Sequence, residues 1–312
     1  GSNREINEPI LSILRSIRKL TEKRFGTHLV AIDVPTGVDS DTGFCTEDVF
    51  PATLTLALGA PKIGLFRFPG ASFSGRVETL SIGIPNDLYG NFPVDLMDPV
   101  LARSCLPPRP RNAHKGSFGT LLVVGGSEAF IGAPILSSAA GYRSGVGLVE
   151  LAAPRIVQQI AGHKLLEQIH TPLGNEGNGT LDSSSSGLVC ERLTAASAGV
   201  IGPGLGASEA VRGFLSSLLL ERPPANTPIV LDADALNILS SCPNWYERIT
   251  NPTVLTPHPG EMARLLNASV DEIQADRLGT AIRSANRWNK IVVLKGAHTV
   301  VAAPSGNSAI SP

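Results

Sequence analysis

The chain has 312 residues, enough for about two domains of average size. Hydrophobic residues make up 42% of it and charged residues 17%, so the chain can bury a substantial core, which excludes disorder as its main state. The 26 Lys and Arg residues against 27 Asp and Glu residues give a net charge of -1 without a basic block. This balance argues against nucleic acid or an anionic membrane as a partner, and a small molecule is expected instead.

The four cysteines are far apart and form no C-x-x-C pair: Cys45, Cys105, Cys190 and Cys242. Neither a zinc site nor a disulfide framework is expected, and a reducing, cytoplasmic compartment fits best. No apolar run approaches the roughly 18 residues needed to span a bilayer. The chain begins with Gly1-Ser2 and stops directly after strand-like sequence at Ser311-Pro312, so we expect both ends to be cuts rather than natural termini.

The first segment predicts one helix and three short strands. Apolar residues at three- and four-residue spacings predict an amphipathic helix over residues 9–24. Runs rich in apolar and β-branched residues predict strands within 28–34, 53–59 and 76–85. The proline-rich sequence PRPRNA (108–113) is the best linker candidate.

After this linker, strands and helices alternate, which predicts βαβ units and a parallel sheet. The expected strands lie in 119–126, 146–154, 198–206, 227–239 and 252–266, the last three ranges including the following turn and helix start; 290–296 and 298–304 form a hairpin-like pair. A helix of small residues is expected from about Gly132 to Ser144. Ligands of such sheets bind beyond the carboxyl ends of the strands, so functional residues are expected in the turns there.

Two of these turns carry candidate binding groups. Gly202 to Gly206 (GPGLG) leaves bare backbone N–H groups in front of a helix, which suits a phosphate and equally fits an ordinary sharp turn. Asp232 and Asp234 follow the next strand and could orient Mg²⁺ through water. For Asp234, capping of the following helix is the favoured interpretation.

The two remaining candidates are a histidine and a lysine. His258 stands between two prolines at a strand end and precedes Gly260 and Glu261, so its imidazole is presented rigidly, and a functional role is favoured over a structural one. Lys295 lies at the turn of the last hairpin, where a lysine can meet phosphate oxygens. Alone it is weak evidence, because exposed hairpin lysines are common.

Seven motifs, in their sequences and in their order along the chain, resemble those of the ADP/ATP-dependent NAD(P)H-hydrate dehydratases of the ribokinase-like superfamily. The motifs are HKGSFG, VVGGS, GAPILSSAAGYRSGVGLVEL, GPGLG, VLDADALN, LTPHPGEMARL and VVLKGAHT, and the match runs from about residue 97 to the end. The first segment, with AIDVPTGVDSDTG, LALGAPKIGLF and SIGIP, looks like the second half of an NAD(P)H-hydrate epimerase domain. The resemblance therefore implies a partial epimerase-like domain over 1–95 and a dehydratase domain over 96–312.

The fold implied is α/β: a ribokinase-like three-layer α/β/α domain preceded by a partial Rossmann-like α/β segment. The implied function is repair of nicotinamide cofactors, in which the hydrates NADHX and NADPHX are dehydrated back to NADH and NADPH at the expense of ADP or ATP. The parent protein would also interconvert the R and S hydrates. Mg²⁺ is implied with the nucleotide, K⁺ with the epimerase-like segment, and a homo-oligomer is expected.

The resemblance also assigns site residues by position. The hydrate is expected at Gly132, Ala133, Gly204 and His258, and the nucleotide phosphates at Lys295, Gly296, Ala297, His298 and Thr299. In the epimerase-like segment, Asp33 matches a substrate-contacting carboxylate, and Thr36 holds the place of a serine that helps to bind K⁺.

The match departs from the family at both ends. The catalytic aspartate of a G-x-G-D loop is expected beyond Pro312, and the first half of the epimerase domain ahead of Gly1, so little activity is expected from residues 1–312 alone. A ribokinase-like kinase of a small alcohol and a catalytically silent nucleotide-binding fragment remain alternatives. A Rossmann dehydrogenase is disfavoured, because no G-x-G-x-x-G follows the first strand of either segment.

Overall fold

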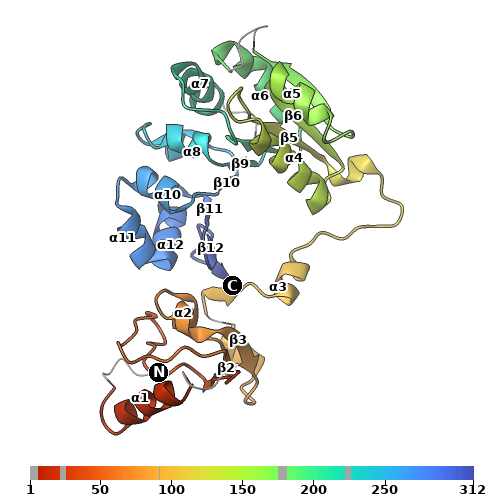
Figure 1. Cartoon of the computed structure of the whole chain (residues 1–312). Coiled ribbons are helices and arrows are strands. Elements are labelled where there is room, and N and C mark those ends of the chain that lie inside the picture. The colour runs from red at the N-terminus through yellow and green to blue at the C-terminus, as the bar shows by residue number, and fades with distance from the viewer. Residues whose placement is uncertain (1–5, 22–25, 91, 175–180, 222–225) are drawn as a thin grey trace. The chain divides into compact units, whose positions relative to one another are not determined.

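The structure is a computed structural model that describes residues 6–21, 26–90, 92–174, 181–221 and 226–312 (Figure 1). The chain forms two compact units, Gly1–Asp98 together with Ala309–Pro312, and Pro99–Ser308. The assignment of family domains to 1–95 and 96–312 stays a prediction.

The first unit contains a small parallel sheet in the order β1-β2-β3. Its elements are α1 (Ile10–Thr21), β1 (Val30–Ile32), β2 (Leu54–Leu58), η1 (Ile63–Phe66), α2 (Ala71–Ser74), β3 (Arg76–Leu80), η2 (Asn86–Tyr89) and β4 (Val94–Leu96). The three predicted strands and the predicted helix are confirmed, and residues 22–24 of that prediction lie outside the described residues. The backbone N–H of Met97 donates to the carbonyl of Ile310 (2.8 Å), which joins the strand β13 (Ser308–Ser311) to this unit.

The second unit alternates strands and helices, as predicted. Its elements are α3 (Pro99–Ser104), η3 (Lys115–Phe118), β5 (Thr120–Val124), α4 (Gly132–Ser144), β6 (Leu148–Pro154), α5 (Arg155–Gly162), β7 (Ile169–Leu173), η4 (Ser183–Ser185), α6 (Ser186–Ala195), β8 (Ala198–Ile201), α7 (Glu209–Leu215), η5 (Ser216–Glu221), β9 (Ile229–Leu231), α8 (Asp234–Leu239), α9 (Trp245–Arg248), β10 (Thr253–Leu255), α10 (Pro259–Leu266), α11 (Val270–Ala275), α12 (Arg277–Trp288), β11 (Ile291–Leu294) and β12 (Thr299–Ala302). The proline-rich linker candidate belongs to this unit, where Arg109 stacks on Phe118 (3.7 Å from guanidinium carbon to ring centroid).

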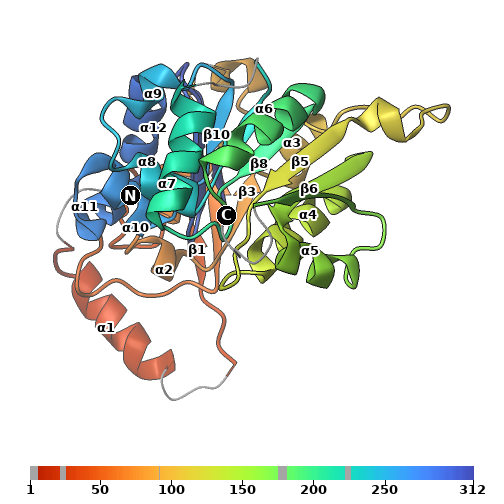
Figure 2. The same ribbon diagram turned by 90° about the horizontal axis from the view of Figure 1, so that it is seen from above.

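The sheet of the second unit runs in the order β7-β6-β5-β8-β9-β10-β11-β12, with helices on both of its faces (Figure 2). The pairs from β7 to β11 are parallel, and the predicted hairpin of β11 with β12 is antiparallel. The chain builds outward from β5 in one direction and from β8 in the other. The gap between the carboxyl ends of β5 and β8 is therefore the topological switch point, where open α/β sheets bind ligands.

Burial of continuous apolar strands against small-residue helices holds this unit together. Val123 of β5, Val149 and Leu151 of β6 and Val157 and Ala161 of α5 form a fully buried cluster. Gly141 of α4 faces β5 so closely that a Cβ there would lie 2.7 Å from Leu121 Cδ2, which explains the small residues of that helix.

Within the part of the chain that is described, no helix has both the length and the apolar character that crossing a membrane requires.

Truncating a core side chain should destabilise the second unit. Leu151→Ala removes a fully buried side chain, so we expect its free energy of unfolding to fall by about 2–5 kcal/mol. Leu166→Ala is the matched control, because Leu166 is 86% exposed and the same change should stay within about 0.5 kcal/mol. Both tryptophans, Trp245 and Trp288, lie in this unit, so tryptophan fluorescence during urea unfolding measures the effect. Equal destabilisation by the two changes would contradict the described core.

Candidate functional site

The glycine-rich turns after β5 and β8 meet at the switch point. The backbone N–H of Gly126 donates to the carbonyl of Pro203 (2.8 Å), and the Ser127 hydroxyl donates to the carbonyl of Gly204 (2.9 Å). Gly204 has a φ of +71°, and a Cβ there would lie 2.8 Å from the Phe130 carbonyl oxygen and 3.4 Å from Ala133 Cβ. Only glycine fits this close approach without strain.

Three residues predicted at the hydrate are thereby brought together. Ala133 lies beside Gly204, and Gly132 is the exposed first residue of α4. The structure places the amino terminus of α4 against the turn after β8, although these two segments are about seventy residues apart in sequence. The result is a tightly packed junction of backbone segments at the switch point, with Gly132 exposed beside it.

The predicted cap at Asp234 is wrong. Ala233, with a φ of +52°, is the N-cap of α8, and Asp234 is the first helical residue. Its carboxylate instead accepts a hydrogen bond from the backbone N–H of Gly206 (2.8 Å). Asp234 therefore joins β9 to the turn after β8, and it already supplies an anionic partner to the last amide of that turn.

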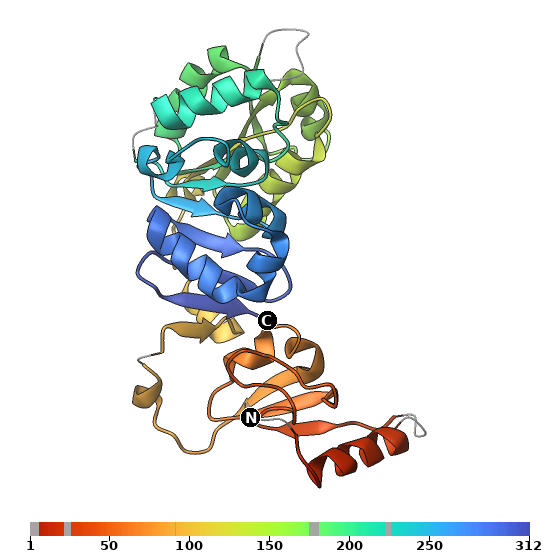
Figure 3. The ribbon, with the colours of Figure 1, turned by 90° about the vertical axis from the view of Figure 1, so that its left-hand side faces the viewer.

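A second cluster lies at the carboxyl ends of β9, β10 and β11, which run side by side in Figure 3. The Lys295 ammonium donates to Asp232 Oδ1 (2.7 Å), and the Thr256 hydroxyl donates to the same oxygen (2.8 Å). Glu261 Oε2 lies 3.9 Å from Lys295 Nζ. The sequence singled out Asp232 and Lys295 separately, and the strand register alone pairs them.

His258 is both a helix cap and an exposed side chain. Its Nδ1 accepts from the backbone N–H groups of Gly260 (3.0 Å) and Glu261 (3.3 Å), and Glu261 Oε2 accepts from the backbone N–H of His258 (2.8 Å), so the two residues form a capping box. In the neutral imidazole the proton is then on Nε2, which lies 3.4 Å from Glu261 Oε1. The His258 side chain is 51% exposed, so the ring remains open to a ligand.

Backbone geometry fixes the predicted phosphate loop, Lys295 to Thr299. Gly296 has a φ of +141° and His298 a φ of +55°. Arg277, at the start of α12, donates to the carbonyls of Leu294 (2.9 Å) and Lys295 (3.0 Å). Gly296 and Ala297 are exposed, and Thr299 Oγ1 donates to the Gly296 carbonyl (3.0 Å).

Arg277 is the functional candidate that sequence reasoning missed. No motif marks it, because it precedes the loop by 18 residues and reaches it only through the packing of α12 on β11. Burial lowers the pKa of its guanidinium from the ordinary value. Burial and the positive charge of Arg277 lower the pKa of His298, so that imidazole is neutral at pH 7.

The predicted site residues form two groups by their contacts, and Asp232 and Asp234 lie between these groups. Ala133 and Gly204 contact each other, and Lys295, Glu261 and His258 form the other group. Gly202 packs against the backbone carbonyl of Asp232, and a Cβ at Gly202 would overlap it. Residues from β8 to β11 thus form one continuous edge of the second unit.

In the first unit, Asp33 is held by a lysine that sequence reasoning did not single out. Asp33 has a φ of +70°, and its Oδ1 accepts from Lys62 Nζ and from the backbone N–H of Leu58 (3.1 Å). Burial raises the pKa of the Asp33 carboxyl, but the hydrogen bonds and the charge of Lys62 outweigh it, so the pKa lies below the ordinary value. Asp33 is therefore ionised at neutral pH beside an ammonium group.

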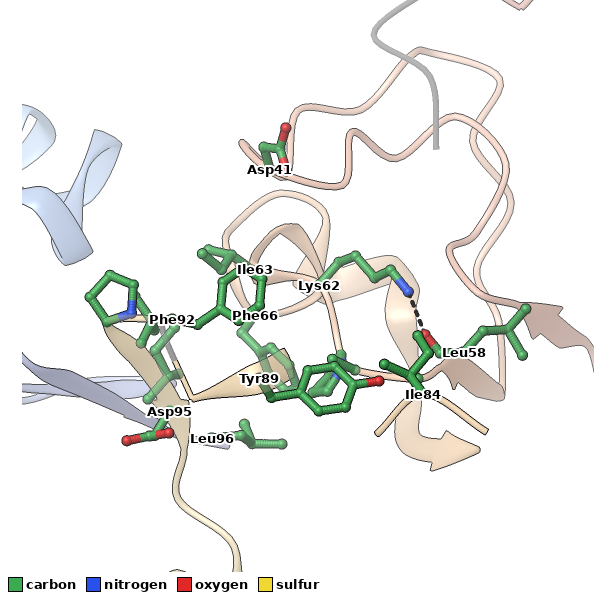
Figure 4. Close-up of a pocket in the computed structure, with 16 residues that line it drawn as sticks. Asp41, Leu58, Lys62, Ile63, Phe66, Ile84, Tyr89, Phe92, Asp95 and Leu96 are labelled. Atoms are coloured by element: carbon green, nitrogen blue, oxygen red, sulfur yellow. Dashed lines mark hydrogen bonds between the residues drawn. The ribbon is translucent and has the colours of Figure 1, made fainter. Parts of the chain in front are cut away.

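A cavity of about 700 Å³ lies next to this pair in the first unit, and Figure 4 shows its lining. Its walls are mostly apolar and aromatic and include Phe66, Tyr89 and Phe92. The Lys62 ammonium donates to the Leu58 carbonyl (2.9 Å), as the dashed line in Figure 4 marks. A cavity of this volume is within the range that holds small molecules.

The described residues offer few metal ligands. None of them form a group of three or more His, Cys, Asp or Glu side chains that could hold an ion. Thr36 is exposed and contributes one hydroxyl, while the nearby Asp33 carboxylate is already paired with Lys62, so these side chains do not by themselves fit K⁺. Mg²⁺ usually binds one or two carboxylates together with substrate phosphates, and the Asp232 carboxylate is already paired with Lys295 and Thr256.

Comparison with known proteins assigns both parts of the chain. The family model described as NAD(P)H-hydrate dehydratase matches residues 121–312, and the model of the YjeF-related protein N-terminus matches residues 1–64. The bifunctional NAD(P)H-hydrate repair enzyme Nnr of Moorella thermoacetica is 41% identical over 91% of this chain and 53% of its own length. That of Thermofilum pendens is 33% identical over 92% of this chain and 54% of its own length. The chain spans about half the length of these curated relatives.

Solved structures agree. The ADP/ATP-dependent NAD(P)H-hydrate dehydratase from Bacillus subtilis, co-crystallised with ATP and Mg²⁺, has a TM-score of 0.57 and 29% identity, covering 70% of this chain and 73% of that one. A ribokinase-like superfamily protein from Enterococcus faecalis matches with a TM-score of 0.59 at 20% identity, which supports the fold alone. The predicted ribokinase-like α/β fold is confirmed. The strand-end residues described above are thus those of a chain that belongs to the NAD(P)H-hydrate dehydratase family.

Proposed function

We propose that the second unit dehydrates (6S)-NADHX and (6S)-NADPHX to NADH and NADPH, with ADP or ATP as phosphoryl donor. The observation that carries this proposal is the juxtaposition, along one sheet edge, of the glycine turns at the switch point and of Lys295 at the end of β11. In a fold matched to this family, that edge offers one surface for a dinucleotide and one cation for a donor phosphate.

The chemistry explains why a nucleotide is needed. In the hydrate, a hydroxyl group on C6 of the nicotinamide ring must leave, and hydroxide is a poor leaving group. Transfer of a phosphoryl group to that oxygen makes it a good one, so the ring nitrogen can expel phosphate, and loss of a proton from C5 then restores the dihydronicotinamide. Catalysis of the first step depends on positioning and on stabilising charge.

We place the nucleotide phosphates at Lys295, Gly296, Ala297, His298 and Thr299. The exposed backbone of Gly296 and Ala297 permits close approach of the phosphates. Arg277 fixes the loop by donating to the carbonyls of Leu294 and Lys295. Mg²⁺ would bind with the nucleotide and neutralise phosphate charge.

We place the hydrate against Gly132, Ala133 and Gly204, with His258 at its edge. Gly132, the exposed first residue of α4, makes this junction accessible to a ligand, and His258 presents an Nε2–H donor whose orientation its cap fixes. No catalytic base is assigned within residues 1–312.

The first unit, we propose, is part of an epimerase domain that interconverts the R and S hydrates. Its support is the Asp33 and Lys62 pair beside the cavity of Figure 4, because epimerisation requires groups that can exchange a proton. K⁺ near Thr36 would need ligands other than Thr36 and Asp33, so no step of the proposal depends on it.

We also propose a cytoplasmic location and a homo-oligomeric state for the protein. All four cysteines are free, which supports a reducing compartment such as the cytoplasm. The exposed apolar side chains of Ile156 and Ile160 on α5 support self-association into a homo-oligomer.

Removing the Lys295 ammonium should weaken nucleotide binding. We expect Lys295→Ala to raise the Kd for Mg-ADP by about tenfold to a hundredfold, the effect of losing a charge-assisted contact of about 1.5–3 kcal/mol. Lys164→Ala, which removes an exposed lysine on the same unit, is the control and should leave the Kd within twofold of wild type. Isothermal titration calorimetry measures both. An unchanged Kd in Lys295→Ala would refute the nucleotide assignment.

His258→Asn should separate ligand binding from helix capping. Asparagine is a good N-cap, so α10 should remain folded while the imidazole is lost. We expect affinity for the S hydrate to fall about tenfold, the typical effect of losing one direct hydrogen bond in a site. Affinity for ADP should stay within twofold. Fluorescence or calorimetric titration with each ligand is the measurement, and a loss confined to ADP would show that the two ligands have been placed in the wrong order.

Asp33→Asn should affect the epimerase reaction alone. In the full-length protein, this change removes the carboxylate that accepts from Lys62 but keeps its size, so interconversion of R and S hydrates should be lost. ADP-dependent recovery of NADH absorbance from the S hydrate should continue at the wild-type rate. Chromatography of the two epimers measures the first activity. Retained interconversion would remove Asp33 from the proposed proton transfer.

A further inference from the structure

The positive charge of Lys295 is already balanced by nearby carboxylates in the absence of a nucleotide. Asp232 Oδ1 lies 2.7 Å from its ammonium nitrogen and Glu261 Oε2 lies 3.9 Å from it. The Thr256 hydroxyl holds Asp232 in this position through a 2.8 Å hydrogen bond. The ammonium group of Lys295 thus has two carboxylates as neighbours, those of Asp232 and Glu261. It therefore attracts a free anion only weakly.

Charges on the neighbouring elements do not reverse this balance. Arg277 is half-buried and its guanidinium is directed at the carbonyls of Leu294 and Lys295. Asp234, two residues after Asp232, adds a further carboxylate at the turn after β8. Among these residues, three carboxylates therefore stand against two cations at the edge of the sheet that faces the proposed nucleotide.

A nucleoside diphosphate has several negative charges at neutral pH, and a divalent cation bound to it cancels two of them. Like charges within a few ångströms repel more strongly than salt can screen, because the Debye length at physiological ionic strength is about 8 Å. Repulsion by a fixed carboxylate scales with the charge of the ligand. It therefore penalises the free nucleotide more than the nucleotide bound to a cation.

We infer that Asp232 is a specificity-determining residue: it sets the charge around Lys295 so that the site accepts the nucleotide with a divalent cation and rejects the free nucleotide. The inference rests on the proposed function, which places the phosphates at Lys295. Asp232 is the better candidate than Glu261, because its side chain is 29% exposed, whereas that of Glu261 is 5% exposed and is committed to the cap of α10.

Asp232→Asn tests the inference, because it removes the charge and keeps the shape. Calorimetric titration with ADP is carried out at constant ionic strength, once with excess Mg²⁺ and once with EDTA. For the wild type we expect free ADP to bind at least tenfold more weakly than Mg-ADP. For Asp232→Asn we expect this gap to shrink to threefold or less, through tighter binding of free ADP.

Two variants serve as matched controls. Glu191→Gln removes one negative charge from an exposed position on α6 and accounts for the change in net charge. Thr256→Val removes the hydroxyl that holds Asp232 but keeps every charge of the cluster. Both should retain the tenfold gap, and the unfolding midpoint from tryptophan fluorescence shows whether each variant is folded.

The wild type alone provides a second test that needs no substitution. Salt weakens binding of an anion to a net positive site, but it should not weaken binding where repulsion opposes the ligand. Between about 50 and 300 mM salt we therefore expect the affinity for free ADP to stay constant or rise. A fall of more than threefold would overturn the inference.

Other outcomes are equally decisive. A tenfold gap that persists in Asp232→Asn would overturn the inference, and so would a loss of Mg-ADP affinity with free ADP unchanged, which would make Asp232 a ligand of the cation. Wild-type protein that binds ADP in neither condition would overturn the proposed function itself. Binding that is insensitive to Asp232 would leave that function standing and remove only the inference.

Discussion

The parallel register of β9, β10 and β11 is the constraint on which the candidate site depends. It aligns Leu231 with Leu255, so the residues that follow these strands leave the sheet at one level. Lys295 then reaches Asp232 across the width of β10, and Thr256, directly after that middle strand, bonds the same carboxylate oxygen. A shift of one residue in either pairing would turn these side chains to opposite faces. The strand register therefore determines that Lys295 and Asp232 form an ion pair, and it fixes the charges around Lys295.

At the switch point, close contacts between backbone segments fix the positions of the candidate site residues. Gly202 lies against the Asp232 backbone, and Gly204 lies against Phe130 and Ala133, so the turn after β8 packs against its neighbours on both sides. These contacts exclude side chains from the place where the two halves of the sheet diverge. What remains is a buried junction of backbone groups, next to the exposed Gly132. Asp234 stabilises the turn by accepting from Gly206, and so adds a negative charge at the same edge.

Polar side chains at helix starts connect stability to the proposed chemistry. His258 and Glu261 cap α10 reciprocally, and the same Glu261 faces Lys295. Because the cap needs Nδ1 as an acceptor, it also determines which ring nitrogen of His258 has the proton. In the first unit, Lys62 plays a comparable part by holding Asp33 in a left-handed conformation beside a cavity. In each case one side chain fixes the geometry and the protonation state of another.

The sequence by itself determined the order of strands and helices and the positions of the glycine turns, because period, β-branching and turn residues act over short distances. It also determined the family, through motifs such as GPGLG and KGAHT whose order survives in the chain. It misplaced Asp234, since a cap and a contact across the sheet look the same in sequence. The pairing of Lys295 with Asp232, and the support of its loop by Arg277, were decided only by the tertiary structure. Those contacts join residues that are 63 and 17 or 18 positions apart, and only strand register and the packing of α12 bring them within reach.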